Sequence, residues 1–143
     1  MQDQNQGRYD AQQFRDLVRD IPFAMFTTVT AGGGLRSRPM VASERAFDGA
    51  LWFFTRMSSA VAQEIAGNAM VNVTYVSAPE DRFVSVSGSA SVVRDVERAG
   101  SMWAPAYNQW FPGGAADPEL SLIRIDVARI EFWDRKTGRM REL

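Results

Sequence analysis

The sequence predicts a mainly β fold, in which antiparallel strands form a barrel and short helices connect some of the strands. Much of the chain between residues 23 and 133 alternates apolar and polar side chains with a period of two, as strands with one buried face do. Turn-forming sequences divide these stretches into short segments, and only brief windows have the helical period. Short strands joined by tight turns favour an antiparallel barrel over a parallel sheet.

The length and composition fit one domain. The chain has 143 residues, 45% of them hydrophobic, which is enough for a substantial core. We expect a disordered tail over residues 1–8, the domain over residues 9–134 and a polar C-terminal tail over residues 135–143. The polar N-terminus does not resemble a signal peptide, and no apolar run approaches the ~18 residues of a membrane span. A cytoplasmic protein without a membrane partner is therefore expected.

The first third of the domain is expected to hold one helix and one hairpin. Phe14 and Val18 share one face of a helix over residues 9–20. Asp10 suits the N-cap of this helix, and Pro22 follows its end. The hairpin consists of two strands and the glycine turn between them, over residues 23–30, 35–43 and 31–34.

The middle of the domain is expected to alternate between strands and a second helix. Residues 50–55 form a strongly apolar strand, after which Ser58 or Ser59 caps a helix that ends near Gly67. The next segments are a strand, a loop and a longer strand, over residues 70–76, 77–81 and 82–94. The many small residues of the longer strand indicate that it is strongly bent and lets another surface approach closely.

The last third is expected to begin with a helix over residues 95–103. An aromatic loop over residues 107–114 follows, and a long strand over residues 120–133 completes the domain. The sequence has no internal repeat and no sign of a second domain.

The composition excludes several classes of chemistry. The chain has no cysteine and no histidine, so it has neither disulfides nor a thiol nucleophile, and neither a histidine base nor a histidine-ligated metal. No clustered acidic motif predicts a carboxylate metal site. The net charge of −1 gives no field that attracts nucleic acid. Any redox or group-transfer chemistry therefore requires a borrowed cofactor.

Two arginines form the first candidate site. Arg36 and Arg38 are two residues apart on an expected strand, so their side chains lie on the same face. Such a pair is either a solvated strand face or a clamp for an anion. Pro39 places this strand at an edge or a bulge, where its backbone can face a ligand.

The second candidate is the start of the helix after the apolar strand. Free backbone N–H groups and the helix dipole make a helix N-terminus a natural phosphate site, and Thr55 and Ser59 can add hydroxyl groups. The alternative is that these serines only cap the helix.

A third candidate is a set of aromatic residues. They belong either to the core or an interface, or to the surroundings of a flat cofactor ring: Trp103, Tyr107, Trp110, Phe111 and Trp133.

Several motifs occur in a characteristic order over residues 9–133. They are Ser37 to Met40 after the glycine turn, Leu51 to Thr55 running into Ser58 and Ser59, Phe83 to Ala90, Asn108 to Gly114, and Ile130 to Asp134. In this order and spacing the sequence resembles the pyridoxamine 5′-phosphate oxidase-like flavoproteins, and more narrowly their general stress protein branch.

The resemblance implies a split β-barrel that forms a homodimer, with two FMN sites at the subunit interface. Arg38 is implied near the phosphate and ribityl chain, Ser59 at the phosphate, and Trp133 at the flavin of the partner subunit. The full set of implied flavin contacts is Arg36, Ser37, Arg38, Pro39, Met40, Phe54, Thr55, Ser58, Ser59, Trp110, Phe111 and Trp133.

One departure from the family pattern concerns the phosphate. The family usually has basic residues just beyond the phosphate serine, where this chain has Ala60 and Val61. A lost charged contact costs about 1.5–3 kcal/mol, or roughly ten- to a hundredfold in affinity, and Arg36 or Arg56 are the candidates to compensate. The vitamin-binding arginines of the family have no clear counterpart, so oxidation of pyridoxine phosphate is not expected.

The sequence leaves three functions open. The first is an FMN-dependent oxidoreductase in which the flavin transfers hydride or electrons to or from an unidentified small molecule. The second is a non-catalytic protein that binds or sequesters flavin. The third is a split barrel that binds another ligand, such as a deazaflavin or an intermediate of haem breakdown.

Overall fold

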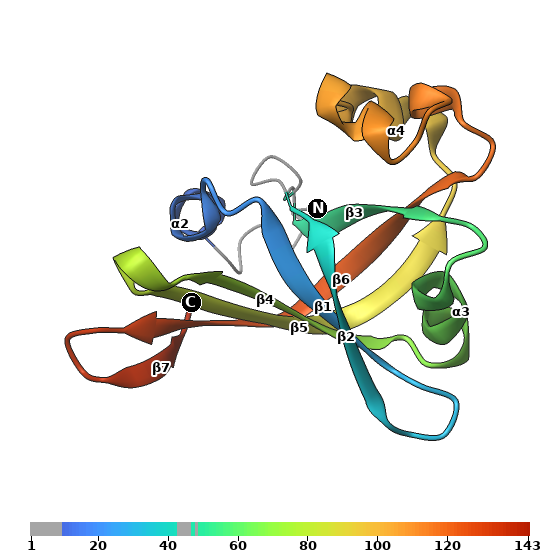
Figure 1. Cartoon of the computed structure of the whole chain (residues 1–143). Helices are drawn as coiled ribbons and strands as arrows, with labels where there is room; N and C mark the ends of the chain where they lie inside the picture. Colours follow the sequence, from blue (N-terminus) through green and yellow to red (C-terminus); the bar gives the residue numbers. More distant parts are fainter. Residues whose placement is uncertain (1–9, 43–46, 48) are drawn as a thin grey trace, which may run out of the picture.

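An antiparallel sheet that curls into a half-barrel forms the body of the molecule (Figure 1). The structure is a computed structural model and describes residues 10–42, 47 and 49–143. The strands are β1 (Phe23–Val29), β2 (Leu35–Val41), β3 (Ala50–Arg56), β4 (Met70–Ser77), β5 (Arg82–Val93), β6 (Leu120–Asp134) and β7 (Arg139–Glu142). The helices are α2 (Ala11–Val18), α3 (Ala60–Gly67) and α4 (Val96–Met102), with short 3-10 helices at η2 (Ala78–Glu80), η3 (Pro105–Gln109) and η4 (Gly114–Ala116). The mainly β antiparallel fold is thus confirmed.

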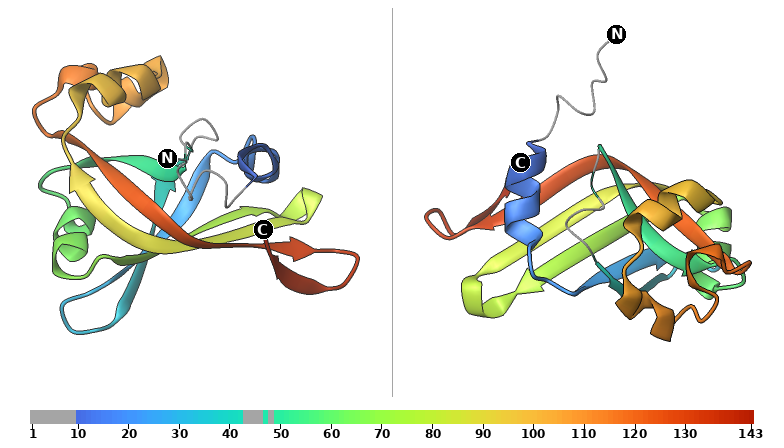
Figure 2. Two further views of the ribbon diagram at one scale, coloured as in Figure 1. Left: turned by 180° about the vertical axis from the view of Figure 1, so that it is seen from behind. Right: turned by 90° about the horizontal axis from the view of Figure 1, so that it is seen from above.

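The strand order places β2 and β3 at the two ends of the sheet. Along the sheet the order is β2-β1-β4-β5-β6-β3, and β7 pairs with β6 outside this path. All of these pairs are antiparallel. Pro39 therefore lies on an edge strand, as its missing N–H group requires. The views in Figure 2 show the long β5 and β6 strands curving past α3 and α4.

The main core lies on the inner, concave side of the sheet. Helix α2 packs Phe14 against Phe47 and Tyr75, with ring centroids 4.8 and 5.8 Å apart. Helix α3 adds Val61 and Ile65 to the same core. A second, smaller core joins β3 and β6 to the α4 region through Ala50, Trp52, Ala99, Phe111, Leu120 and Leu122. Both expected N-caps are present, because Asp10 and Ser59 each accept a hydrogen bond from the first turn of their helix.

The bend in β5 depends on one glycine. The register with β6 shifts between Ser87 and Gly88, as at a β-bulge. A Cβ atom on Gly88 would lie 2.4 Å from the Asp126 carbonyl oxygen and 2.9 Å from Cγ2 of Ile125. The expected close approach is therefore real, and the approaching surface is the backbone of β6.

The C-terminal segment differs from the expectation. Residues 135–143, expected to be a polar tail, form a turn and strand β7, whose residues are all exposed. Gly138, with φ of 66°, makes the turn possible. The expected loop after β4 is the 3-10 helix η2, followed by Asp81 in the left-handed region. The expected tail over residues 1–8 lies outside the described residues. Among the described helices, none has the length and apolar character needed to cross a membrane.

Candidate functional site

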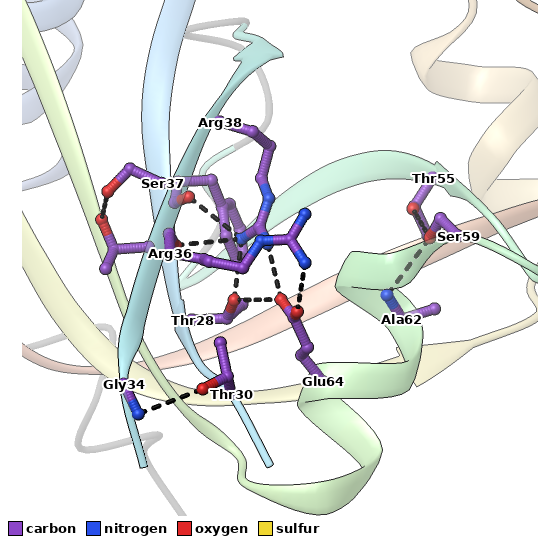
Figure 3. A network of polar contacts seen from close by, with 12 residues as sticks. Thr28, Thr30, Gly34, Arg36, Ser37, Arg38, Thr55, Ser59, Ala62 and Glu64 are labelled. Carbon is purple, nitrogen blue, oxygen red and sulfur yellow. Dashed lines mark hydrogen bonds and ion pairs between the residues drawn. The ribbon is translucent and has the colours of Figure 1, made fainter. Parts of the chain in front are cut away.

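The two arginines of β2 converge on one carboxylate of α3. Arg36 and Arg38 do share a strand face, and this face is turned toward Glu64 (Figure 3). Arg38 Nη2 lies 2.6 Å from Glu64 Oε1, and Arg36 Nη1 lies 3.1 Å from Glu64 Oε2. The side chain of Arg36 is 58% exposed, whereas those of Arg38 and Glu64 are 20% and 13% exposed. The expected anion clamp therefore exists, and a carboxylate of the same chain occupies it.

Thr28 links the carboxylate to the inner arginine. Its hydroxyl group is buried, donates to Glu64 Oε1 over 2.6 Å and accepts from Arg38 Nη1 over 2.8 Å. Arg38 Nη1 also donates to the carbonyl oxygens of Phe26 and Arg36. The hydrogen bond from Thr28, together with the two guanidinium groups, holds the pKa of Glu64 below its ordinary value of 4.5, although desolvation opposes this shift. Glu64 is thus a carboxylate that stays ionised at neutral pH.

This pKa shift makes part of the stability of the fold depend on pH. Because the folded pKa of Glu64 is lowered, its ionised form stabilises the protein above pH 4.5, and this stabilisation is lost as the pH falls through the lower folded value. We expect wild type to have a higher Tm than Glu64→Gln at pH 7, and the difference to shrink below pH 4.5. Thermal unfolding of both proteins from pH 3 to pH 8 measures this, and a constant difference would contradict it.

Hydrogen bonds at the two ends of the β1–β2 hairpin show which backbone groups face the open edge. Ala42 donates to the Pro22 carbonyl, and Thr30 donates to the Gly34 carbonyl. Hydrogen-bonded pairs alternate with non-bonded pairs in an antiparallel ladder, so Pro39 belongs to a non-bonded pair. Its ring nitrogen therefore points away from β1, toward the free edge of the sheet.

Ser37 and Met40 lie on opposite faces of β2. The Ser37 hydroxyl lies 2.6 Å from that of Thr27 on the outer face, away from Glu64. Met40 is partly buried against the main core. The backbone groups of Ser37, like the carbonyl of Pro39, point to the free edge, where the ladder with β1 does not use them. The β2 residues thus offer two separate surfaces and one polar backbone edge.

The start of α3 is built as the serine pattern predicts. The Ser59 hydroxyl accepts from the Ala62 N–H over 3.1 Å and lies 2.9 Å from the hydroxyl of the buried Thr55. Ser58 instead donates to Oε1 of Glu119 over 2.7 Å. Val61 packs into the core. Within this chain Ser59 caps the helix and Ser58 bridges to Glu119, and a role of the serines at a phosphate stays a prediction.

An aromatic cluster surrounds Phe54. Its ring centroid lies 5.3 Å from that of Trp103, 5.2 Å from Tyr107 and 6.3 Å from Phe111. Since successive side chains of a strand alternate, Phe54 and Thr55 point to opposite faces of β3. The two residues therefore do not line one surface within this chain.

Arg56 belongs to the same cluster. Its guanidinium donates to the carbonyl of Trp110 and lies 5.0 Å from the centroid of Phe111. Phe111 is buried, and Trp110 is 40% exposed. Arg56 is thus turned to the aromatic loop, and the expectation that it compensates at the phosphate is not supported.

Trp133 lies far from the arginine pair within one chain. It pairs with Met140 in the β6–β7 hairpin. This hairpin and helix α3 lie on opposite sides of the molecule (Figure 1). Its side chain is 37% exposed. Any contact of Trp133 with a ligand at Arg38 requires a second copy of the chain.

The pattern of the sequence did not identify Glu64 or Thr28. Ala24, Phe26 and Thr28 are buried, whereas the residues between them are exposed or half-buried, so the period of two places Thr28 on the inner face. A polar residue at such a position needs a partner, which was the missed signal. Glu64 has no comparable signal, because its partners lie 26 to 36 residues away in the sequence.

Comparison with known proteins supports the expected family. Residues 9–143 match the family described as pyridoxamine 5′-phosphate oxidase like. Protein bli-3 of Neurospora crassa is 27% identical over a region covering 77% of this chain and 57% of that protein. The chain thus spans a little over half the length of that relative.

Two solved structures share the fold. General Stress Protein 26 from Bacillus anthracis str. Sterne has a TM-score of 0.77 at 20% identity, covering 93% of this chain and 98% of that chain. A general stress FMN/FAD binding protein from Xanthomonas citri has a TM-score of 0.71 at 27% identity, covering 86% and 87%. The curled sheet is therefore the split β-barrel that the motifs predict. With a match that extends from residue 9 to residue 143, the chain belongs to the pyridoxamine 5′-phosphate oxidase-like family.

Proposed function

We propose that this chain is a flavin-binding protein of the general stress type, which holds FMN where β2 meets α3. One observation carries the proposal: two polar segments that are distant in the sequence meet at this helix. Arg38 of β2 contacts Glu64 of α3, and Thr55 of β3 contacts Ser59 at the start of the same helix. The similarity to a protein named for FMN/FAD binding supports the choice of cofactor.

The residues present fit most parts of an FMN molecule. The outward backbone groups of Ser37 and Pro39 suit the polar edge of a flavin ring, because an edge strand leaves them outside the ladder. The Thr55 and Ser59 hydroxyls and the first N–H groups of α3 suit the ribityl chain and phosphate. A bound flavin supplies hydride or electron transfer. The chain itself positions the flavin, since it has no histidine or cysteine to transfer protons or electrons.

Loss of Arg38 or Ser59 tests the placement. We expect Arg38→Ala and Ser59→Ala each to weaken FMN binding by about tenfold, because each removes a polar group from the proposed site. Titration followed by flavin fluorescence measures the affinity, and circular dichroism checks folding. Arg82→Ala is a control that removes a similarly buried arginine from the start of β5, where it pairs with Glu80. Unchanged affinity in both test variants would reject the site.

The outer face of the sheet supports the proposal of a homodimer. On the outer face, Val76 pairs with Phe83 across β4 and β5, Trp133 pairs with Met140 across β6 and β7, and Phe23 begins β1; we call these five residues the apolar row. Four of these side chains are 37% to 51% exposed. An exposed apolar row of this length is typical of a contact surface. A second copy seated there would bury Trp133 at the interface, where the family pattern expects it.

The rate of NADH or NADPH oxidation by the flavin-loaded protein distinguishes an enzyme from a protein that only binds flavin. We propose flavin-mediated electron transfer, and steady oxidation of NADH or NADPH above the rate with free FMN supports it. A rate equal to that of free FMN identifies a non-catalytic flavin carrier.

A further inference from the structure

The arginine pair is already neutralised in part by the protein itself. Both oxygens of the Glu64 carboxylate are in use, Oε1 by Arg38 and Thr28 and Oε2 by Arg36. Guanidinium groups bind a phosphate in the same two-pronged way. Glu64 therefore binds the two arginines in the way that a phosphate would.

The other polar groups near this position also have partners within the chain. Ser59 caps α3, Ser58 donates to Glu119, and Arg56 is bound to the aromatic loop. The helix positions that usually hold basic residues in the family are Ala60 and Val61. Two guanidinium groups and one carboxylate leave a formal charge of +1 at the cluster. A phosphate monoester carries about −1.5 to −2 at pH 7, so its repulsion from Glu64 offsets part of the attraction that the two arginines exert on a phosphate at Arg38.

We propose that Glu64 determines the flavin specificity of this site: as an internal counter-ion of Arg36 and Arg38, it removes most of the affinity that a flavin phosphate would gain. The inference rests on the proposed function, since it assumes that a flavin binds between β2 and α3. Its consequence is that riboflavin and FMN bind with similar affinity. Binding then depends on the ring and the ribityl chain, which the β2 edge and the hydroxyl groups contact.

The two flavins and one isosteric substitution test this role. Wild type and Glu64→Gln are each titrated with FMN and with riboflavin. In wild type the two dissociation constants are expected to agree within about threefold, a difference of only about 0.7 kcal/mol. Glu64→Gln keeps an amide oxygen for Thr28 and Arg38 but removes the charge. We expect it to strengthen FMN binding about tenfold and to leave riboflavin binding unchanged.

A matched control and a second variant keep the test decisive. Glu80→Gln removes a carboxylate that also pairs with an arginine, Arg82, but at the β4–β5 connection. It is expected to change neither affinity. Arg36→Gln removes the exposed arginine of the pair, so it should weaken FMN binding and spare riboflavin binding. If Glu64→Gln does not fold, two measurements still test the role of Glu64. They are the ratio of the FMN and riboflavin dissociation constants in wild type and the affinities of the Arg36→Gln variant.

The titration results distinguish a failure of the proposed role of Glu64 from a failure of the proposed flavin-binding function. Failure of wild type to bind either flavin overturns the proposed function. Binding of both flavins with a preference for FMN of tenfold or more overturns the role of Glu64 alone. Weaker FMN binding by Glu64→Gln would likewise overturn it, because that result means that Glu64 orients Arg38 for the phosphate.

Discussion

Replacement of Gly88 by alanine is expected to lower the free energy of unfolding by about 3 kcal/mol, a typical cost of overpacking a tight site. The added Cβ would lie 2.4 Å from the carbonyl oxygen of Asp126. That atom belongs to the backbone of β6, which cannot move without disturbing the longest ladder of the sheet. Urea denaturation measures the change as a lower midpoint at a similar m-value.

Gly100→Ala is the matched control for this substitution. Gly100 lies within α4, and a Cβ atom there meets nothing within 4 Å. Alanine is a better helix former than glycine, so this variant should be as stable as wild type or up to ~1 kcal/mol more stable. A Gly88→Ala protein as stable as wild type would show that β6 yields, and that the bend does not depend on the glycine.

Val76→Arg is expected to weaken the proposed homodimer by at least roughly a hundredfold. Val76 lies within the apolar row of the outer face and is 48% exposed in one chain. A charge buried there without a partner costs about 3 kcal/mol or more, and two-fold symmetry introduces it twice. Analytical ultracentrifugation at micromolar concentration should give a dimer for wild type and a monomer for the variant.

Val96→Arg separates this effect from a general effect of added charge. Val96 is 53% exposed at the start of α4, outside the apolar row, so this variant should remain a dimer. Flavin affinity should fall with the dimer if Trp133 of a second copy completes the site. A monomeric wild type, or a dimeric Val76→Arg protein, would contradict the proposed interface.

The strands and helices could be predicted because their patterns are local. Period-two stretches between glycine turns identified β1 to β6, and serine and aspartate caps marked the starts of α2 and α3. Strand β7 escaped because its four residues include only Met140 as an apolar side chain, too few to show a period. Its existence depends on the edge of β6, which is a tertiary property.

The candidate site was only partly predictable for the same reason. Strand alternation correctly placed Arg36 and Arg38 on one face. What they face is decided by the crossing of α3 over the sheet, which brings Glu64 to them across more than 25 residues. Strand alternation also places Phe54 and Thr55 on opposite faces of β3. The sequence motif was interpreted as one continuous contact surface, and this interpretation overlooked the alternation. The predicted contacts with the flavin itself stay predictions.

The outward nitrogen of Pro39 also bears on how the protein stays dispersed at high concentration. An open half-barrel leaves the edge of β2 available to the strands of other molecules, which is a common route to aggregation. In the middle of that edge the proline offers no donor, so an incoming strand cannot form a continuous ladder. A small ligand with a few polar atoms is not hindered in this way, since it does not need the full register. The same residue that keeps this edge open to a ligand thus protects it from polymerisation.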